Sequence, residues 1–275
     1  HRTFIHIFAN EGSRTITITA VDEDGTHTSA GSIAIVVRNA APTMATLVLD
    51  AASIAENGVA ALSGAFADPG ALDAHTLTIL WGDGTPAQIV PLAAGVLQFN
   101  ATHRYLDDAP SGTPADSFTI SVTVSDGLVV SAPLATQVTV TNTAPAFGFF
   151  TFPSAPVTEG TSLAFSGNLI DPGTLDTQAV TVDWGDGSPL QSLALSPAKT
   201  FSASHVYAIP GTYVAVVSAS DDDGGLVQQT RQVVVDDLAP AVNAASLGVA
   251  SLGNLFVRTG SFTEHKSIAV LIIGS

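Results

Sequence analysis

The sequence predicts an all-β protein built from tandem antiparallel β-sandwiches, and three observations support this fold class. Short apolar segments of alternating character recur along the chain, each bounded by Gly, Pro, Asp or Ser, as in strands joined by tight turns. No segment keeps the 3.6-residue apolar period of a helix over a helix-like length. The segment Trp81–Thr85 recurs as Trp184–Ser188, and Pro42 precedes the first as far as Pro145 precedes the second. A unit copied over so long an interval is a whole domain and not a solenoid repeat.

The composition narrows the possible partners. The 275 residues are 46% hydrophobic, which can fill several small cores of about 100 residues each. With 24 acidic and 8 basic residues, the net charge is −16, which repels nucleic acid and suits cation binding. The chain has no Cys, so neither disulfides nor thiol chemistry are expected. No apolar run approaches the ~20 residues of a membrane span, and the most apolar segment, Ile268–Ile273, has the length of a strand.

Proline marks the expected domain boundaries. An Ala-Pro pair follows an alternating strand at Pro42, Pro145 and Pro240, where Pro cannot continue the sheet ladder and therefore ends the strand. The linkers are short, so we expect stiff joints. The expected domains are the C-terminal half of a repeat (1–39), two complete repeats (42–141 and 145–237) and the N-terminal half of another repeat (240–275).

Each complete copy shows the same order of elements. In the first copy we expect an acidic turn at 56–58, a strand over 62–66, a loop over 68–73, a strand over 76–81, a His-x-Tyr marker at 103–105 and a final hairpin over 118–140. The counterparts in the second copy are 159–161, 165–169, 171–176, 180–184, 205–207 and 213–235. About seven short strands in roughly 100 residues form an antiparallel sandwich. The first copy is longer because of an insertion over Leu106–Ser117, which we expect to be a loop that leaves the sandwich unchanged.

These markers resemble the polycystic-kidney-disease (PKD) repeat, an immunoglobulin-like β-sandwich with the pattern Trp-Gly-Asp-Gly, His-x-Tyr and Gly-x-Tyr-x-Val. The second copy carries all three, at Trp184–Gly187, His205–Tyr207 and Gly211–Val214. In the first copy Phe118 replaces the last Tyr, and the C-terminal fragment has Ile272–Gly274 where the Trp motif belongs. The resemblance implies tandem immunoglobulin-like (PKD-type) modules of extracellular or cell-surface proteins of bacterial type, without catalysis.

The marker residues are expected to be structural. Each Trp ends an inward-facing strand, so a core position is favoured over an exposed binding platform. Each Gly-Asp-Gly turn uses its Asp to bond backbone amides. A lone His in each copy makes a poor transition-metal site, so we expect it to bond across a strand end while the Tyr closes a corner. The residues with these roles are Trp81, Asp83, His103 and Tyr105 in the first copy and Trp184, Asp186, His205 and Tyr207 in the second.

Acidic side chains are expected to converge at the boundaries between domains. In an immunoglobulin-like strand order, the loop after the second strand and the last hairpin turn face the preceding copy, whose first turn and Gly-Asp-Gly turn point back toward them. Calcium takes six to eight oxygen ligands, so such a set could bind it; the alternative is a set of solvated turn residues. The candidate ligands of this interdomain calcium site are Asp171, Asp176, Asp221, Asp222, Asp223, Glu56 and Asp83, with Asp22, Glu23, Asp24, Asp68 and Asp73 as candidates at the preceding boundary.

The expected function is structural. The chain has no Gly-x-Ser-x-Gly, His-Glu-x-x-His or phosphate-loop motif, so we expect no enzyme. The half-domains at the two ends are complementary, and one chain's tail could complete the next chain's head by strand addition, which gives a filament.

We therefore expect an extracellular structural or adhesive protein, a head-to-tail homopolymer or surface stalk whose partners are other copies or neighbouring repeats of the same chain. The alternative is a set of polysaccharide- or protein-binding accessory modules of a secreted hydrolase. That role needs a row of exposed aromatics, for which Phe147, Phe149, Phe150 and Phe152 are candidates.

Overall fold

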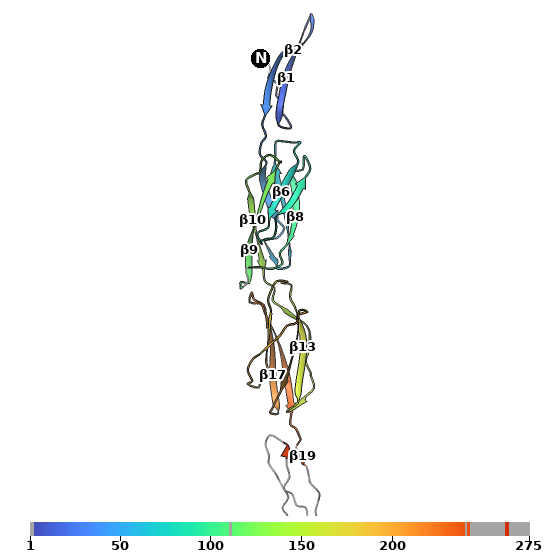
Figure 1. Cartoon of the computed structure of the whole chain (residues 1–275), viewed down its shortest axis with the longest axis vertical. Coiled ribbons are helices and arrows are strands. Elements are labelled where there is room, and N and C mark those ends of the chain that lie inside the picture. Colours follow the sequence, from blue (N-terminus) through green and yellow to red (C-terminus); the bar gives the residue numbers. More distant parts are fainter. Residues whose placement is uncertain (1–2, 110–111, 240, 243–261, 264–275) are drawn as a thin grey trace, which may run out of the picture. The chain divides into compact units, whose positions relative to one another are not determined.

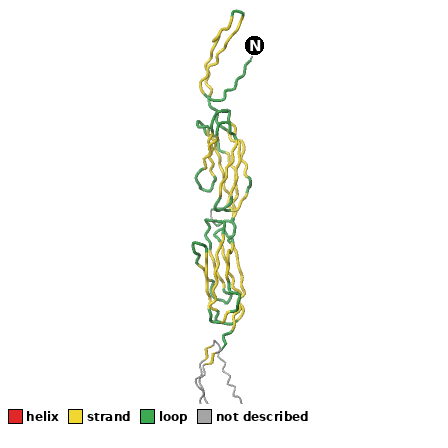
Figure 2. Tube along the Cα trace, turned by 90° about the vertical axis from the view of Figure 1, so that its right-hand side faces the viewer, coloured by secondary structure: helices red, strands yellow, loops and turns green. Residues whose placement is uncertain are grey.

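The computed structural model describes residues 3–109, 112–239, 241–242 and 262–263. Every regular element in these residues is a β-strand, so the prediction of an all-β chain is confirmed (Figure 2). The residues group into two compact units, each described separately below. The first unit comprises His1–Ala144, Asp171–Thr177 and Asp222–Gly225, and the second comprises Pro145–Ile170, Gln178–Asp221 and Leu226–Ser275.

The first complete repeat is a sandwich of a five-stranded and a three-stranded sheet (Figure 1). Its strands are β3 (Thr43–Leu49), β4 (Ser53–Ala55), β5 (Val59–Ala67), β6 (His75–Leu80), β7 (Gln88–Leu92), β8 (Gln98–Arg104), β9 (Ala115–Ser125) and β10 (Leu134–Thr141). The sheets have the strand orders β4-β10-β9-β6-β7 and β3-β5-β8.

The second complete repeat has the same architecture. Its strands are β11 (Ala146–Thr151), β12 (Val157–Thr158), β13 (Ser162–Ile170), β14 (Ala179–Asp183), β15 (Gln191–Leu193), β16 (Thr200–Val206), β17 (Gly211–Ser220) and β18 (Leu226–Asp236). The orders β12-β18-β17-β14-β15 and β11-β13-β16 match those of the first repeat strand for strand.

The opening segment of each repeat contributes a strand to both sheets. β3 pairs with β5, and the chain then crosses over so that β4 runs parallel to the last strand, β10. β11 and β12 do the same with β13 and β18. The sequence does not predict these two parallel pairs, because strands of two or three residues show no readable alternation. The crossover ties the two sheets together and places Glu56 directly after β4.

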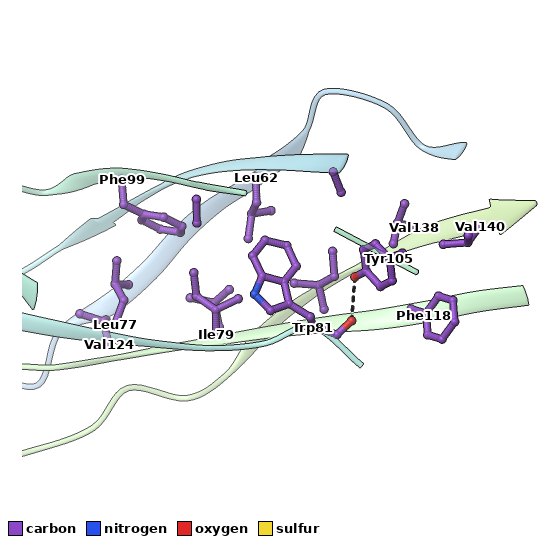
Figure 3. Close-up of a cluster of buried hydrophobic side chains, with 14 of the residues drawn as sticks. Leu62, Leu77, Ile79, Trp81, Phe99, Tyr105, Phe118, Val124, Val138 and Val140 are labelled. Carbon is purple, nitrogen blue, oxygen red and sulfur yellow. Dashed lines mark hydrogen bonds between the residues drawn. The ribbon is translucent and has the colours of Figure 1, made fainter. Parts of the chain in front are cut away.

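The core of the first repeat lies between its two sheets (Figure 3). Alternate residues of β6 point inward, so Leu77 and Ile79 are fully buried, and Trp81 follows them onto the same face. The second repeat buries Val180 and Val182 of β14 in the same way. Burial of each large aliphatic side chain stabilises the fold by about 1.5–3 kcal/mol.

The insertion in the first repeat is only partly a loop. We expected a loop over Leu106–Ser117, but β9 begins at Ala115, and Asp116 and Ser117 pair with β10. That part of the prediction is wrong because Ala115–Ser117 can extend the ladder beside β10, which lengthens the strand and shortens the loop.

The N-terminal segment forms a two-stranded hairpin, β1 (Gly12–Asp22) and β2 (Gly25–Val37). Ile16, Ile18 and Ile33 are exposed on it. At the other end, β19 (Ala241–Val242) pairs with β20 (Phe262–Thr263). The rest of the expected half-repeat over 240–275, including the apolar segment Ile268–Ile273, lies outside the described residues.

Candidate functional site

The marker residues of the first repeat form one connected network. Trp81 is buried, and its Nε1 donates to Oε1 of Gln88 at 2.9 Å. The His103 ring stacks on the indole with centroids 4.9 Å apart, and its Nε2 lies 2.7 Å from Oδ2 of Asp83. The Tyr105 hydroxyl donates to the carbonyl oxygen of Trp81 at 2.8 Å (Figure 3).

The second repeat reproduces this network. Trp184 Nε1 donates to Gln191 Oε1 at 3.0 Å, and the His205 ring stacks on the indole at 4.7 Å. His205 Nε2 lies 2.7 Å from Asp186 Oδ2, and the Tyr207 hydroxyl donates to the Trp184 carbonyl at 2.9 Å. The network locks the Gly-Asp-Gly turn and the end of the His-x-Tyr strand onto the core, which is a structural role.

The electrostatics of this network also suit structural bonds. Burial acts to raise the pKa of Asp186, but hydrogen bonds from Ser188 and His205 outweigh it and lower this pKa to about 2. Burial raises the pKa of Tyr207 to about 12, so its hydroxyl stays protonated as a donor. Asp186 therefore stays ionised and Tyr207 stays protonated, so each keeps its own hydrogen bonds. Groups of this kind are poorly suited to proton transfer.

A second feature of the first compact unit is a set of carboxylates that we call the Asp176 cluster. Its members come from four loops: the turn after β4, the insertion between β8 and β9, the segment Asp171–Thr177, and the segment Asp222–Gly225. The members are Glu56, Asp107, Asp108, Asp171, Asp176, Asp222 and Asp223.

The carboxylates of the Asp176 cluster approach one another closely. One oxygen each from Glu56, Asp107 and Asp176 lie within 4.8 Å of one another, which is close enough to share a metal ion. The same limit holds for Asp107, Asp108 and Asp223, and for Asp176, Asp222 and Asp223. Because these triads share members, they form one continuous site.

Several oxygens of the Asp176 cluster are buried without a hydrogen-bond partner. Asp108 is 0% exposed and Asp176 is 6% exposed, and neither carboxylate has a partner on either oxygen. Glu56 accepts the Thr143 N–H at Oε1 at 2.8 Å, while its Oε2 has no partner. Burial, followed by repulsion from neighbouring carboxylates, raises the pKa of Asp176 to about 7 and that of Asp108 to about 6. Burial likewise raises the pKa of Glu56 to about 7.

A smaller set, the Asp73 cluster, occupies the equivalent loops of the first repeat. One oxygen each from Asp68, Asp73 and Asp126 lie within 4.8 Å of one another. His75 Nε2 lies 2.8 Å from Asp68 Oδ2, and Asn39 Nδ2 donates to Asp126 Oδ2 at 2.8 Å. Protein donors therefore reach Asp68 and Asp126 in this cluster, whereas no donor reaches either oxygen of Asp176.

The structure brings together six of the seven carboxylates predicted for the calcium site: Glu56, Asp171, Asp176, Asp221, Asp222 and Asp223. Asp83 is held instead by His103 and Thr85. Asp107 and Asp108 are not predicted from the sequence, where their one signal is an acidic pair inside an insertion. Asp126 is not predicted as a site residue either. Asp22, a candidate at the preceding boundary, is exposed and bonds His27.

The aromatic segment of the second repeat faces mainly inward. Phe147, Phe150 and Phe152 pack against the core, whereas Phe149 is 49% exposed. This segment therefore does not present the row of exposed rings that a polysaccharide-binding surface requires.

Comparison with known proteins gives one family. Residues 142–235 match the family model described as "PKD domain". No curated protein matches the chain. In the described part of the chain, no helix is long and apolar enough to cross a membrane.

Solved structures of β-sandwich modules are also similar to parts of the chain. The PKD domain of an M14-like peptidase from Thermoplasmatales archaeon SCGC AB-540-F20 is 24% identical, with 34% of this chain and 92% of that chain covered and a TM-score of 0.28. The PKD1 domain of Vibrio anguillarum Epp is 20% identical, with 35% and 99% covered and a TM-score of 0.26. A two-domain fibronectin type-III segment of chicken tenascin is 14% identical, with 70% and 98% covered and a TM-score of 0.38.

Proposed function

Because this chain is a PKD-type immunoglobulin-like repeat protein, we propose that it is a structural module of the bacterial cell surface, in which tandem β-sandwiches form a head-to-tail filament or stalk. PKD domains are typical of extracellular proteins and are generally non-catalytic modules. The observation that carries the proposal is the duplication of one internal design. Both repeats have the same strand order and the same Trp–His–Asp–Tyr network, at matching distances.

The duplicated network suits a load-bearing spacer. Within each repeat, the tyrosine hydroxyl joins two strand ends through a buried bond to the Trp carbonyl. The crossover between sheets adds a parallel pair that holds the end of the opening segment against the last strand, β4 on β10 and β12 on β18. A sandwich whose opening and closing strands are paired resists separation of its ends, because those hydrogen bonds must break together.

The hairpin β1–β2 supports assembly through strand addition. The corresponding final hairpin of the second repeat, β17–β18, buries Ala215, Val217 and Val233 against the opposite sheet. On β1–β2, residues such as Ile16 and Ile18 are exposed instead. We propose that the remaining strands of a repeat cover this face, and that a second copy of the chain supplies them.

Sedimentation velocity over a range of protein concentrations tests the assembly. We expect species at successive multiples of the single-chain mass. The variant Ile18→Lys places a charge on the hairpin face and is expected to shift the distribution to single chains. Val214→Lys is the matched control, since Val214 is similarly exposed on the outer face of β17. Single chains at every concentration would end the filament proposal and leave a stalk of covalently joined repeats.

A further inference from the structure

The Asp176 cluster contains more buried negative charge than the protein's own groups compensate. Asp108 and Asp176 are more than nine-tenths buried, and all four of their carboxylate oxygens lack a hydrogen-bond partner. An unpaired buried carboxylate costs several kcal/mol, so such groups are normally paired or bound to a metal. The orphaned oxygens point to a ligand that the protein itself does not supply.

The orphaned oxygens converge on shared positions. Asp176 approaches Glu56 and Asp107, and Asp108 approaches Asp107 and Asp223, in each case with one oxygen per residue inside a 4.8 Å limit. Two oxygens bound to the same calcium ion at about 2.4 Å each can lie at most about 4.8 Å apart. The spacing therefore permits these oxygens to bind a common cation.

The donor set selects the kind of cation. Every member offers carboxylate oxygens, and no His belongs to any of the acidic groups identified in the described part of the chain. Hard oxygen ligands favour calcium or magnesium over zinc or copper. Calcium accepts six to eight oxygens in an irregular arrangement, whereas magnesium requires a regular octahedron and keeps several waters. A crowded set of seven carboxylates, four of them buried, fits calcium.

The backbone around the cluster permits this close approach. A Cβ added to Gly173 would collide with Oδ2 of Asp176 and with Oε2 of Glu56, so only glycine leaves room for both carboxylates. The Gly112 N–H, at the far end of the insertion, donates to Asp223 Oδ1 at 2.5 Å. The insertion thus brings its own Asp107 and Asp108 to carboxylates contributed by distant parts of the sequence.

We propose that the Asp176 cluster is a calcium-binding site, with Glu56, Asp107, Asp108 and Asp176 as ligands and with the insertion of the first repeat as the segment that completes it. Calcium bound there ties the insertion to the turn after β4 and to the Asp171–Thr177 loop. The site does not depend on filament formation, because all its ligands belong to one compact unit of one chain.

Calorimetry with calcium chloride tests the site directly. The chain is stripped with chelator, titrated by isothermal calorimetry, and its thermal unfolding is compared in chelator and in millimolar calcium. We expect binding of at least one ion per chain and a rise in Tm of about 5 °C or more. Magnesium chloride at the same concentration is expected to give a much smaller rise, and an equal rise would contradict the assignment to calcium.

Two variants test whether the calcium-dependent rise in Tm arises at the Asp176 cluster. Asp176→Asn and Asp108→Asn are each expected to remove most of the calcium-dependent rise in Tm without lowering Tm in chelator. Asp73→Asn, at the equivalent position of the first repeat, is the matched control and is expected to keep the full rise. If Asp176→Asn proves to be misfolded by circular dichroism, Asp108→Asn carries the test. No shift in the unaltered chain, or a full shift in both cluster variants, would overturn the proposal.

Discussion

The Asp73 and Asp176 clusters lie on equivalent loops of the two repeats, yet they treat their carboxylates in opposite ways. In the Asp73 cluster, His75 faces Asp68 and Asn39 faces Asp126, and none of its three carboxylates has a buried oxygen without a partner. In the Asp176 cluster, Asp176 has two such oxygens. The same loop arrangement thus has donors for Asp68 and Asp126 in one copy and no donor for Asp176 in the other.

The difference can be traced to one residue that differs between the repeats and to one insertion. Gln178 stands in the second repeat where the first has His75, and Lys199 donates to Gln178 instead of to a carboxylate. The insertion then adds Asp107 and Asp108 to a set that is already acidic. The second repeat lacks the His donor, and the insertion adds the carboxylates of Asp107 and Asp108. Both differences increase the uncompensated negative charge and favour binding of a cation from solution.

The largest expected effect on stability comes from removing the His75 partner of Asp68 in the Asp73 cluster. The side chains of His75 and Asp68 are 1% and 0% exposed, so His75→Ala leaves Asp68 as a buried charge without its partner. Loss of one member of a buried pair costs about 3–5 kcal/mol. Urea unfolding should show this loss, whereas Gln178→Ala, at the equivalent position, should cost far less. Equal losses at the two positions would contradict the contrast between the clusters.

In the Asp176 cluster, removing a carboxylate is expected to raise the free energy of unfolding instead of lowering it. In chelator, Asp176→Asn removes a buried charge that no group compensates, so the free energy of unfolding should rise by about 2–3 kcal/mol. Asp73→Asn should change stability little, because Asp73 is less buried. Parallel urea unfolding of both variants in chelator measures the difference, and a destabilised Asp176→Asn chain would show that the carboxylate is already satisfied in the free protein.

The sequence predicts much of this arrangement, for physical reasons that particular residues illustrate. Alternation of apolar residues and Pro boundaries predict the sandwiches, and the strand order then places Glu56, Asp171 and Asp176 near one pole. The parallel strands β4 and β12 are too short to leave a pattern. Asp107 and Asp108 lie in a loop with no counterpart in the other repeat, so its path depends on tertiary contacts that sequence does not encode locally.

The state of each carboxylate is the least predictable property. Asp83 and Asp176 both lie in segments that connect strands, but one is held by His103 and the other by no donor. The difference depends on which side chain of a distant strand reaches the loop. The His-x-Tyr marker supplies that side chain for Asp83, and no marker of this kind accompanies Asp176.

The carboxylates of the Gly-Asp-Gly turns, Asp83 and Asp186, extend the comparison, because both accept hydrogen bonds from protein donors. Hydrogen bonds from Ser188 and His205 lower the pKa of Asp186 to about 2, below the value of about 3.9 in an unfolded chain. A depressed folded-state pKa stabilises the protein above the unfolded pKa, and this contribution is lost as pH falls from about 4 to 2. Asp186→Asn should therefore cost about 2 kcal/mol at pH 7 and little near pH 2. Urea unfolding of both chains at several pH values gives the difference, and a difference independent of pH would rule out a stabilising contribution from the ionised Asp186 carboxylate.

The smallest expected effect separates the two networks that otherwise look the same. Tyr105→Phe and Tyr207→Phe each remove one buried hydroxyl and leave the Trp carbonyl that it bonds without that donor, which costs about 1–2 kcal/mol. The ring stays in place, since Phe keeps its contacts with the neighbouring aromatic, Phe118 in the first repeat and Tyr213 in the second.

Because the second repeat has an additional hydroxyl at Tyr213, which donates to the Ile209 carbonyl, its corner keeps one anchor after Tyr207→Phe. The first repeat has Phe118 at that position and no second hydroxyl, so Tyr105→Phe should cost more than Tyr207→Phe. Thermal unfolding of both variants in chelator decides the order, and a larger loss for Tyr207→Phe would mean that the Tyr213 bond contributes nothing to the corner.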